Sequence, residues 1–177
     1  MLFRSTEAMA FLFQKKDLEL IGMKDNDANK QHLLALDNFW GSYEIMGVSL
    51  VDMYVWRWLY ENPDATAVQL KEAVISIARD VWNKYYAEVF GTKDEPILAI
   101  YSHMIDYPLY LPAYPVGHLI EFQLDKQLEG KPFADEVMRI FSQGRVIPQL
   151  WMKTAVGKEI SVDPLLGGVD EALKAIR

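Results

Sequence analysis

Two imidazoles and three phenols lie close together in a proline-rich segment of the sequence. They are contributed by His103, Tyr107, Tyr110, Tyr114 and His118, with three prolines between them. An imidazole can donate a hydrogen bond to a peptide carbonyl or carry a proton, and a phenol can donate to an oxyanion. The segment is therefore suited to stabilising a tetrahedral intermediate. The alternative is that these side chains only tie an irregular loop to the core.

A single carboxylate, Glu7, lies near the beginning of a stretch that is otherwise apolar. An ionised carboxylate that leaves water must be paired, hydrogen-bonded or bound to a metal. Two interpretations remain open. Glu7 lies in the first turn of a helix, where the helix dipole and Arg4 stabilise its charge, or it is a metal ligand.

The segment around His103 resembles a known family motif. The spacing of His103, Pro108, Tyr110, Tyr114 and Gly117 is similar to the H-F-x-x-x-P-F-Y-x-Y-x-Y-x-x-G signature of oligoendopeptidase F and its thimet-type relatives. These proteins are zinc peptidases of the gluzincin group. The pair Glu7-Ala8 at a helix start likewise resembles the stretch that supplies their third zinc ligand.

The resemblance implies roles for individual residues. Glu7 would be a zinc ligand, while His103, Tyr110 and either Tyr107 or Tyr114 would contact the peptide substrate and its oxyanion. The expected fold is the C-terminal helical half of the catalytic domain. The sequence departs from the motif where Met104 replaces an aromatic residue and Pro112 replaces a tyrosine.

The zinc-binding H-E-x-x-H helix of the family is missing from the sequence. None of the three histidines, His32, His103 and His118, has a second histidine four residues away. A catalytic zinc needs about three protein ligands, and the resemblance supplies one. We therefore expect the C-terminal portion of a zinc-dependent oligopeptidase that is inactive alone and that forms a homo-oligomer or associates with an H-E-x-x-H-bearing half. The alternative is a non-catalytic helical module that binds peptides or proteins.

Composition excludes several other classes. The 177 residues carry 25 acidic and 18 basic side chains, a net charge of -7, which would repel a nucleic acid backbone. The absence of cysteine is compatible with a reducing cytoplasm. The most apolar stretch, 48–60, contains Asp52 and Arg57 and is shorter than the ~20 residues that cross a bilayer. We predict a cytoplasmic protein with no secretion signal and no contact with membranes.

The elements that must position these residues are all expected to be helices. No stretch alternates apolar and polar residues for long enough to predict a sheet, and no linker divides the chain, so we predict an all-α, multi-helix domain over residues 1–177. A boundary near 91–96 is a weaker alternative. Thr66 and Gln69 predict a capping box, and the prolines of 107–115 predict a connection without regular structure. Helices are expected over 6–22, 28–60 with a possible break near Gly41 or Gly47, 66–90, 96–104, 117–128, 133–141, 148–156 and 164–176.

Overall fold

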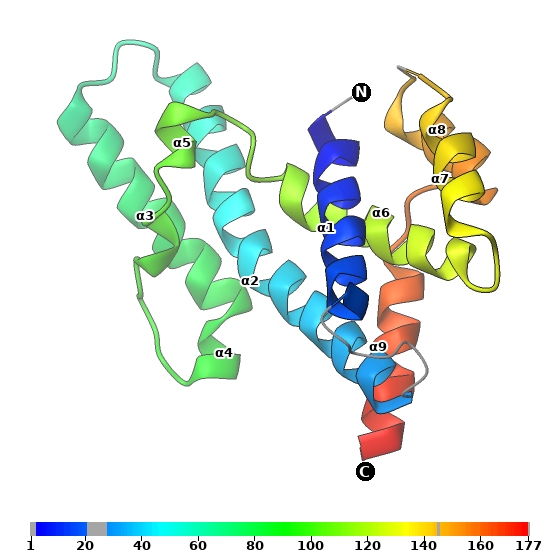
Figure 1. The fold of residues 1–177 in the computed structure, drawn as a ribbon. Coiled ribbons are helices and arrows are strands. Elements are labelled where there is room, and N and C mark those ends of the chain that lie inside the picture. Colours follow the sequence, from blue (N-terminus) through cyan, green and yellow to red (C-terminus); the bar gives the residue numbers. More distant parts are fainter. Residues whose placement is uncertain (1–2, 21–27, 145, 177) are drawn as a thin grey trace. The chain divides into compact units, whose positions relative to one another are not determined.

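The computed structural model of the chain describes residues 3–20, 28–144 and 146–176 (Figure 1). All regular elements within these ranges are helical, which confirms the predicted all-α class. No helix in these ranges combines the length and the apolar character needed to cross a membrane. The elements are α1 (Phe3–Leu20), α2 (Ala28–Glu61), α3 (Ala67–Tyr85), α4 (Ala87–Phe90), the 3-10 helix η1 (Ile97–Ala99), α5 (His103–Asp106), α6 (Ala113–Leu128), α7 (Phe133–Phe141), α8 (Pro148–Val156) and α9 (Asp163–Ile176).

Most helix boundaries agree with the local sequence signals. Helix α2 is continuous through both Gly41 and Gly47, so neither glycine breaks it. The capping box is present: the Thr66 Oγ1 accepts from the Gln69 N–H, and the Gln69 side chain accepts from the Thr66 N–H. Helices α7 and α8 have the predicted bounds. Helix α1 ends at Leu20, and the predicted end of this helix at residue 22 lies outside the described residues.

The predicted helix over 66–90 is divided at Tyr86. There the backbone φ of -120° departs from helical geometry, although the Tyr86 N–H still donates to the Trp82 carbonyl. The Tyr86 ring is buried, and its hydroxyl donates to the carbonyl of Tyr43 in α2. This long-range contact accompanies the interruption, and no signal near Tyr86 in the sequence indicates it.

The segment between Pro96 and Ala113 is less helical than predicted. Only the short helices η1 and α5 form in place of the expected helix over 96–104. Helix α6 then begins at Ala113, four residues before the predicted start. Pro115 therefore lies in the first turn of α6, where the missing N–H of proline leaves no hydrogen bond unmade.

The chain divides into two compact units. The first comprises Met1–Ser42 and Val116–Arg177, and the second comprises Tyr43–Pro115. Each unit has apolar side chains in a core of its own. The expectation of one domain over residues 1–177 stays a prediction.

The first unit packs α1 closely against α6. A Cβ on Gly117 would lie 2.9 Å from the Glu7 Cβ and 3.2 Å from the Ala8 nitrogen, so only glycine permits this approach. Behind the contact, Ala8, Leu12, Ile120 and Leu124 are almost completely buried in one cluster that also contains residues of α7 and α8. Glycine at position 117 therefore fixes how α1 is placed on α6.

The second unit packs α3 and the segment 97–114 against the C-terminal part of α2. Its core contains Val51 and Val55 of α2, Ala78 and Trp82 of α3, and Leu111 of the loop before α6. The Trp82 indole N–H donates to the Thr92 carbonyl at 3.0 Å and holds the turn after α4. This unit carries the imidazoles and phenols of the predicted substrate-binding segment, apart from His118.

Candidate functional site

The second unit brings four of the predicted residues into one cluster. We refer to His103, Tyr107, Tyr110 and Tyr114 as the imidazole–phenol cluster. The His103 ring centroid lies 5.9 Å from that of Tyr107, 6.3 Å from that of Tyr110 and 6.5 Å from that of Tyr114. The rings of Tyr110 and Tyr114 meet edge to face at 5.5 Å. His103 is thus surrounded by all three predicted phenols.

Short local elements produce this arrangement. His103 opens the single-turn helix α5, Tyr107 follows it, and Tyr110 lies in the loop that leads to Tyr114 in the first turn of α6. The Tyr107 N–H donates to the His103 carbonyl, and the Tyr110 N–H donates to the Tyr107 carbonyl. These turns fold the chain back on itself and place side chains from three consecutive pieces around one imidazole.

The cluster is partly open to solvent. Tyr107 is 64% exposed, whereas His103, Tyr110 and Tyr114 are half-buried. Partly desolvated imidazole and phenol groups can donate hydrogen bonds to a carbonyl or an oxyanion more strongly than they can in bulk water. The cluster therefore presents imidazole and phenol hydrogen-bonding groups at a partly open surface.

A buried carboxylate lies beneath the cluster. Asp52 of α2 has no exposed surface, and its Oδ1 accepts a hydrogen bond from the Leu109 N–H at 3.2 Å. Leu109 has a φ of +61°, a conformation that costs a non-glycine residue about 1–2 kcal/mol. The chain is therefore held in a strained turn over Asp52, between Tyr107 and Tyr110.

Burial raises the pKa of Asp52 above its ordinary value of 3.8. The N–H dipoles of Leu109 and Leu111 and the charge of His103 act in the opposite direction and lower it. Desolvation is the largest of these causes. Burial thus disfavours the ionised form of Asp52. The segment that bears the cluster partly offsets this effect, because its N–H groups and His103 stabilise the carboxylate.

Asp52 entered the sequence-based predictions only as an obstacle to a membrane span and was missed as part of a site. A signal was available. Asp52 stands on α2 beside Val51 and between Val48 and Val55, all three of them buried, so an acid interrupts an apolar helix face. Which segment covers that face could not be read from the sequence, because Leu109 lies far along the chain.

Glu7 lies in the first unit, away from the first turn of its helix. Helix α1 begins at Phe3, which puts Glu7 in the second turn, so the interpretation based on the first-turn dipole is wrong. The side chain of Arg4 is outside the described residues. Glu7 is half-buried and lies against Gly117 of α6. Whether Glu7 and the imidazole–phenol cluster face a common hollow stays a prediction.

The second histidine of the sequence motif also belongs to the first unit. The His118 ring stacks on the Phe11 ring with centroids 4.0 Å apart and an interplanar angle of 4°. His118 therefore packs between α1 and α6 within the first unit.

Zinc coordination needs several ligands within reach of one point. Among the residues that the structure describes, no three His, Asp or Glu side chains are close enough to hold a metal ion together. Glu7 offers the carboxylate chemistry of a zinc ligand, but a catalytic site would need further ligands in addition to it. The zinc expectation stays a prediction for a larger assembly.

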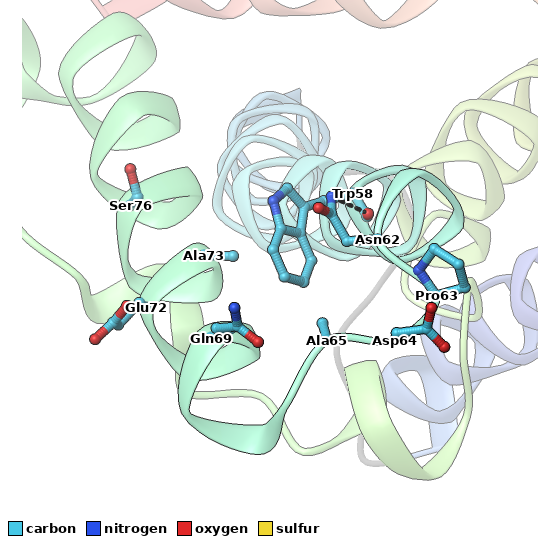
Figure 2. Close-up of a pocket in the computed structure, with 9 residues that line it drawn as sticks. All are labelled: Trp58, Asn62, Pro63, Asp64, Ala65, Gln69, Glu72, Ala73 and Ser76. Atoms are coloured by element: carbon cyan, nitrogen blue, oxygen red, sulfur yellow. Dashed lines mark hydrogen bonds between the residues drawn. The ribbon is translucent and has the colours of Figure 1, made fainter.

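A hollow of about 590 Å³ lies elsewhere in the second unit, between the end of α2 and the start of α3. Figure 2 shows the Trp58 indole extending into it, with Ala65 and Ala73 facing the ring and the carboxylates of Asp64 and Glu72 farther out. None of its lining residues belongs to the imidazole–phenol cluster. The hollow is lined by the Trp58 ring and alanine side chains, with the carboxylates of Asp64 and Glu72 at its edge.

Comparison with family models, curated proteins and solved structures finds no match for this chain.

Proposed function

We propose that this chain is the C-terminal portion of a zinc-dependent oligopeptidase, supplying part of the substrate cleft and the third metal ligand, and inactive alone. The observation that supports the proposal best is the grouping of His103 with Tyr107, Tyr110 and Tyr114 on one partly open surface. These residues overlap with those that carry the sequence resemblance. Their chemistry fits recognition of a peptide carbonyl.

In this proposal the chain's own residues bind and orient the peptide. His103 and Tyr110 donate hydrogen bonds to the carbonyl that is attacked and to the oxyanion that develops from it. Tyr107 and Tyr114 pack beside them and restrict their side-chain rotation, since both rings lie within about 6.5 Å of His103. Bound zinc would polarise the attacking water and the carbonyl.

Glu7 would be one zinc ligand, and the remaining ligands would come from an H-E-x-x-H helix on a separate half. The proposal therefore requires a partner chain or a longer parent protein. It also requires Glu7 to face the same hollow as the cluster in the assembled enzyme.

Peptide binding by the purified chain tests the first part of the proposal. A tryptic digest of casein provides a mixture of extended peptides, and NMR spectra of chain labelled at histidine and tyrosine report where they bind. We expect the resonances of His103 and Tyr110 to shift. Tyr110→Phe should weaken binding about five- to tenfold, the effect of one lost hydrogen bond of about 1 kcal/mol.

A non-catalytic peptide-binding module is the second candidate, and the hollow beside Trp58 favours it. Trp58→Ala is therefore the variant that tests this second candidate, in parallel with Tyr110→Phe for the first. If Trp58→Ala abolishes binding while Tyr110→Phe and His103→Ala leave it intact, the peptidase proposal is replaced by the module. Zinc-dependent cleavage of a fluorogenic peptide by the chain alone would contradict the expected inactivity.

A further inference from the structure

Helix α2 holds the segment 103–111 at two points one helical turn apart. The Trp56 indole N–H donates to the Met104 carbonyl at 3.1 Å, and the Asp52 Oδ1 accepts from the Leu109 N–H at 3.2 Å. Residues four apart lie on the same face of a helix. One face of α2 thus contacts the backbone directly after His103 and again between Tyr107 and Tyr110.

Buried apolar side chains flank these two hydrogen bonds. Met104 is 5% exposed and Leu111 is completely buried, whereas Leu109 between them is 46% exposed. The segment therefore has its ends anchored in the core and its middle raised toward solvent. In that middle part, the hydrogen bond to Asp52 ties the backbone to α2.

Packing alone does not explain an aspartate at this position. Its second oxygen, Oδ2, is buried and receives no hydrogen bond of ordinary geometry from the described residues, although the Leu111 N–H dipole lies close enough to act on the carboxylate. Leaving such an atom unpaired costs about 1–3 kcal/mol, and an apolar residue of similar size would avoid that penalty. A full negative charge, however, strengthens the hydrogen bond from Leu109 roughly twofold relative to a neutral acceptor.

We propose that Asp52 is the positioning residue of the imidazole–phenol cluster. By accepting the Leu109 N–H it holds the left-handed turn at Leu109, and this turn sets the directions in which Tyr107 and Tyr110 leave the backbone. Trp56 secures the preceding turn next to His103. The positioning role of Asp52 is inferred from these two hydrogen bonds. The expected effect of Asp52 on peptide binding rests, in addition, on the proposed function.

Two substitutions of Asp52 separate the effect of its charge from the effect of its shape. Asp52→Asn keeps the size and an acceptor oxygen but loses the charge, and Asp52→Ala removes the acceptor altogether. Asp106→Asn is the control, because it removes an exposed acid from the same segment. Amide hydrogen exchange over residues 107–111 and the proton shift of the Leu109 amide report on the turn directly.

We expect Asp52→Asn to raise exchange over 107–111 by about threefold to tenfold and Asp52→Ala by more, in proportion to the hydrogen bond that each weakens. In the unmodified chain the Leu109 amide shift should follow the titration of Asp52, and in Asp52→Asn it should not change over the same pH range. Casein-digest peptides should bind Asp52→Asn about five- to tenfold more weakly. Asp106→Asn should leave all three readouts unchanged.

Unchanged exchange over 107–111 in both Asp52 variants would overturn the inference, whatever happens to peptides. If Asp52→Ala does not fold, Asp52→Asn decides. Increased exchange together with peptide binding that never depends on His103 or Tyr110 would keep the positioning role and reject the proposed function instead.

Discussion

At the scale of single residues, Asp52 imposes a pH-dependent penalty on folding. Its pKa in the folded chain is raised, mainly by burial, above the ordinary value of 3.8 that it has when unfolded. The folded state therefore binds a proton more tightly than the unfolded state does. Protonated Asp52 therefore favours the folded state. This contribution to stability is complete below pH 3.8 and is lost as the pH rises through the pKa that Asp52 has in the folded chain.

Asparagine does not titrate, so the Asp52→Asn variant should lack this pH-dependent contribution to stability. We expect the free energy of unfolding of Asp52→Asn, relative to that of the unmodified chain, to increase as the pH rises from about 3.8 toward neutrality. Urea denaturation at several pH values measures this difference. A difference that shrinks with rising pH would show that Asp52 is stabilised as a carboxylate, contrary to the burial argument.

Tyr86 should produce a second pH effect at the alkaline end. Burial raises the pKa of Tyr86 to about 12. Because the neutral phenol is favoured in the folded chain, its stabilising contribution is complete below pH 10 and is lost as the pH rises through about 12.

In Tyr86→Phe we expect the stability to fall by about 1 kcal/mol at neutral pH, since the hydrogen bond to the Tyr43 carbonyl is lost. The decline in stability between pH 10 and 12 should also become shallower. Thermal unfolding followed by circular dichroism at about pH 7 and above pH 10 measures both effects. Tyr60→Phe is the control, because Tyr60 is 73% exposed.

At the scale of elements, two adjacent glycines of α9 report on how that helix packs. A Cβ on Gly168 would lie 2.6 Å from the Cζ of Phe122, a buried ring of α6, whereas a Cβ on Gly167 would meet nothing within 4 Å. The same substitution at neighbouring positions therefore separates helix propensity from packing.

We expect Gly168→Ala to destabilise the chain by about 1–3 kcal/mol, because Phe122 must move in a packed core. Gly167→Ala should stabilise it by about 0.5–1 kcal/mol, the usual gain from replacing glycine inside a helix. Chemical denaturation of the two variants compares them directly. Equal effects at both positions would mean that α9 does not lie on Phe122 as described.

At the scale of the whole molecule, the proposed function divides its parts between the two units. The candidate metal ligand Glu7 belongs to the first unit and the imidazole–phenol cluster to the second. In that proposal the other zinc ligands come from an H-E-x-x-H half, so Glu7 is one of several ligands that a catalytic zinc needs. The chain alone should therefore bind peptides through the second unit without help from metal.

We predict that Glu7→Gln leaves the affinity of the chain for casein-digest peptides unchanged, with or without added zinc. Titration calorimetry measures the affinity in both conditions, and His103→Ala serves as the variant that should weaken it. A zinc-dependent increase in affinity that disappears in Glu7→Gln would contradict this division, since it would mean that the chain assembles a metal site by itself.

Local signals in the sequence determined the helical class and most helix positions. The Thr66–Gln69 capping box and the apolar periodicity act within a few residues, and such signals are written in contiguous sequence. The chemical character of 103–118 is likewise a property of the sequence alone, because the segment's three phenols, two imidazoles and three prolines can be read directly from its composition. Whether that segment serves a peptidase stays a prediction.

Only the tertiary structure decided which of these residues meet. It stacked His118 on Phe11, divided the predicted 66–90 helix at Tyr86, and placed Asp52 under the turn at Leu109. Each outcome depends on a partner tens of residues away. Contacts of that range are set by the packing of whole helices, and no spacing within one segment contains the information that selects them.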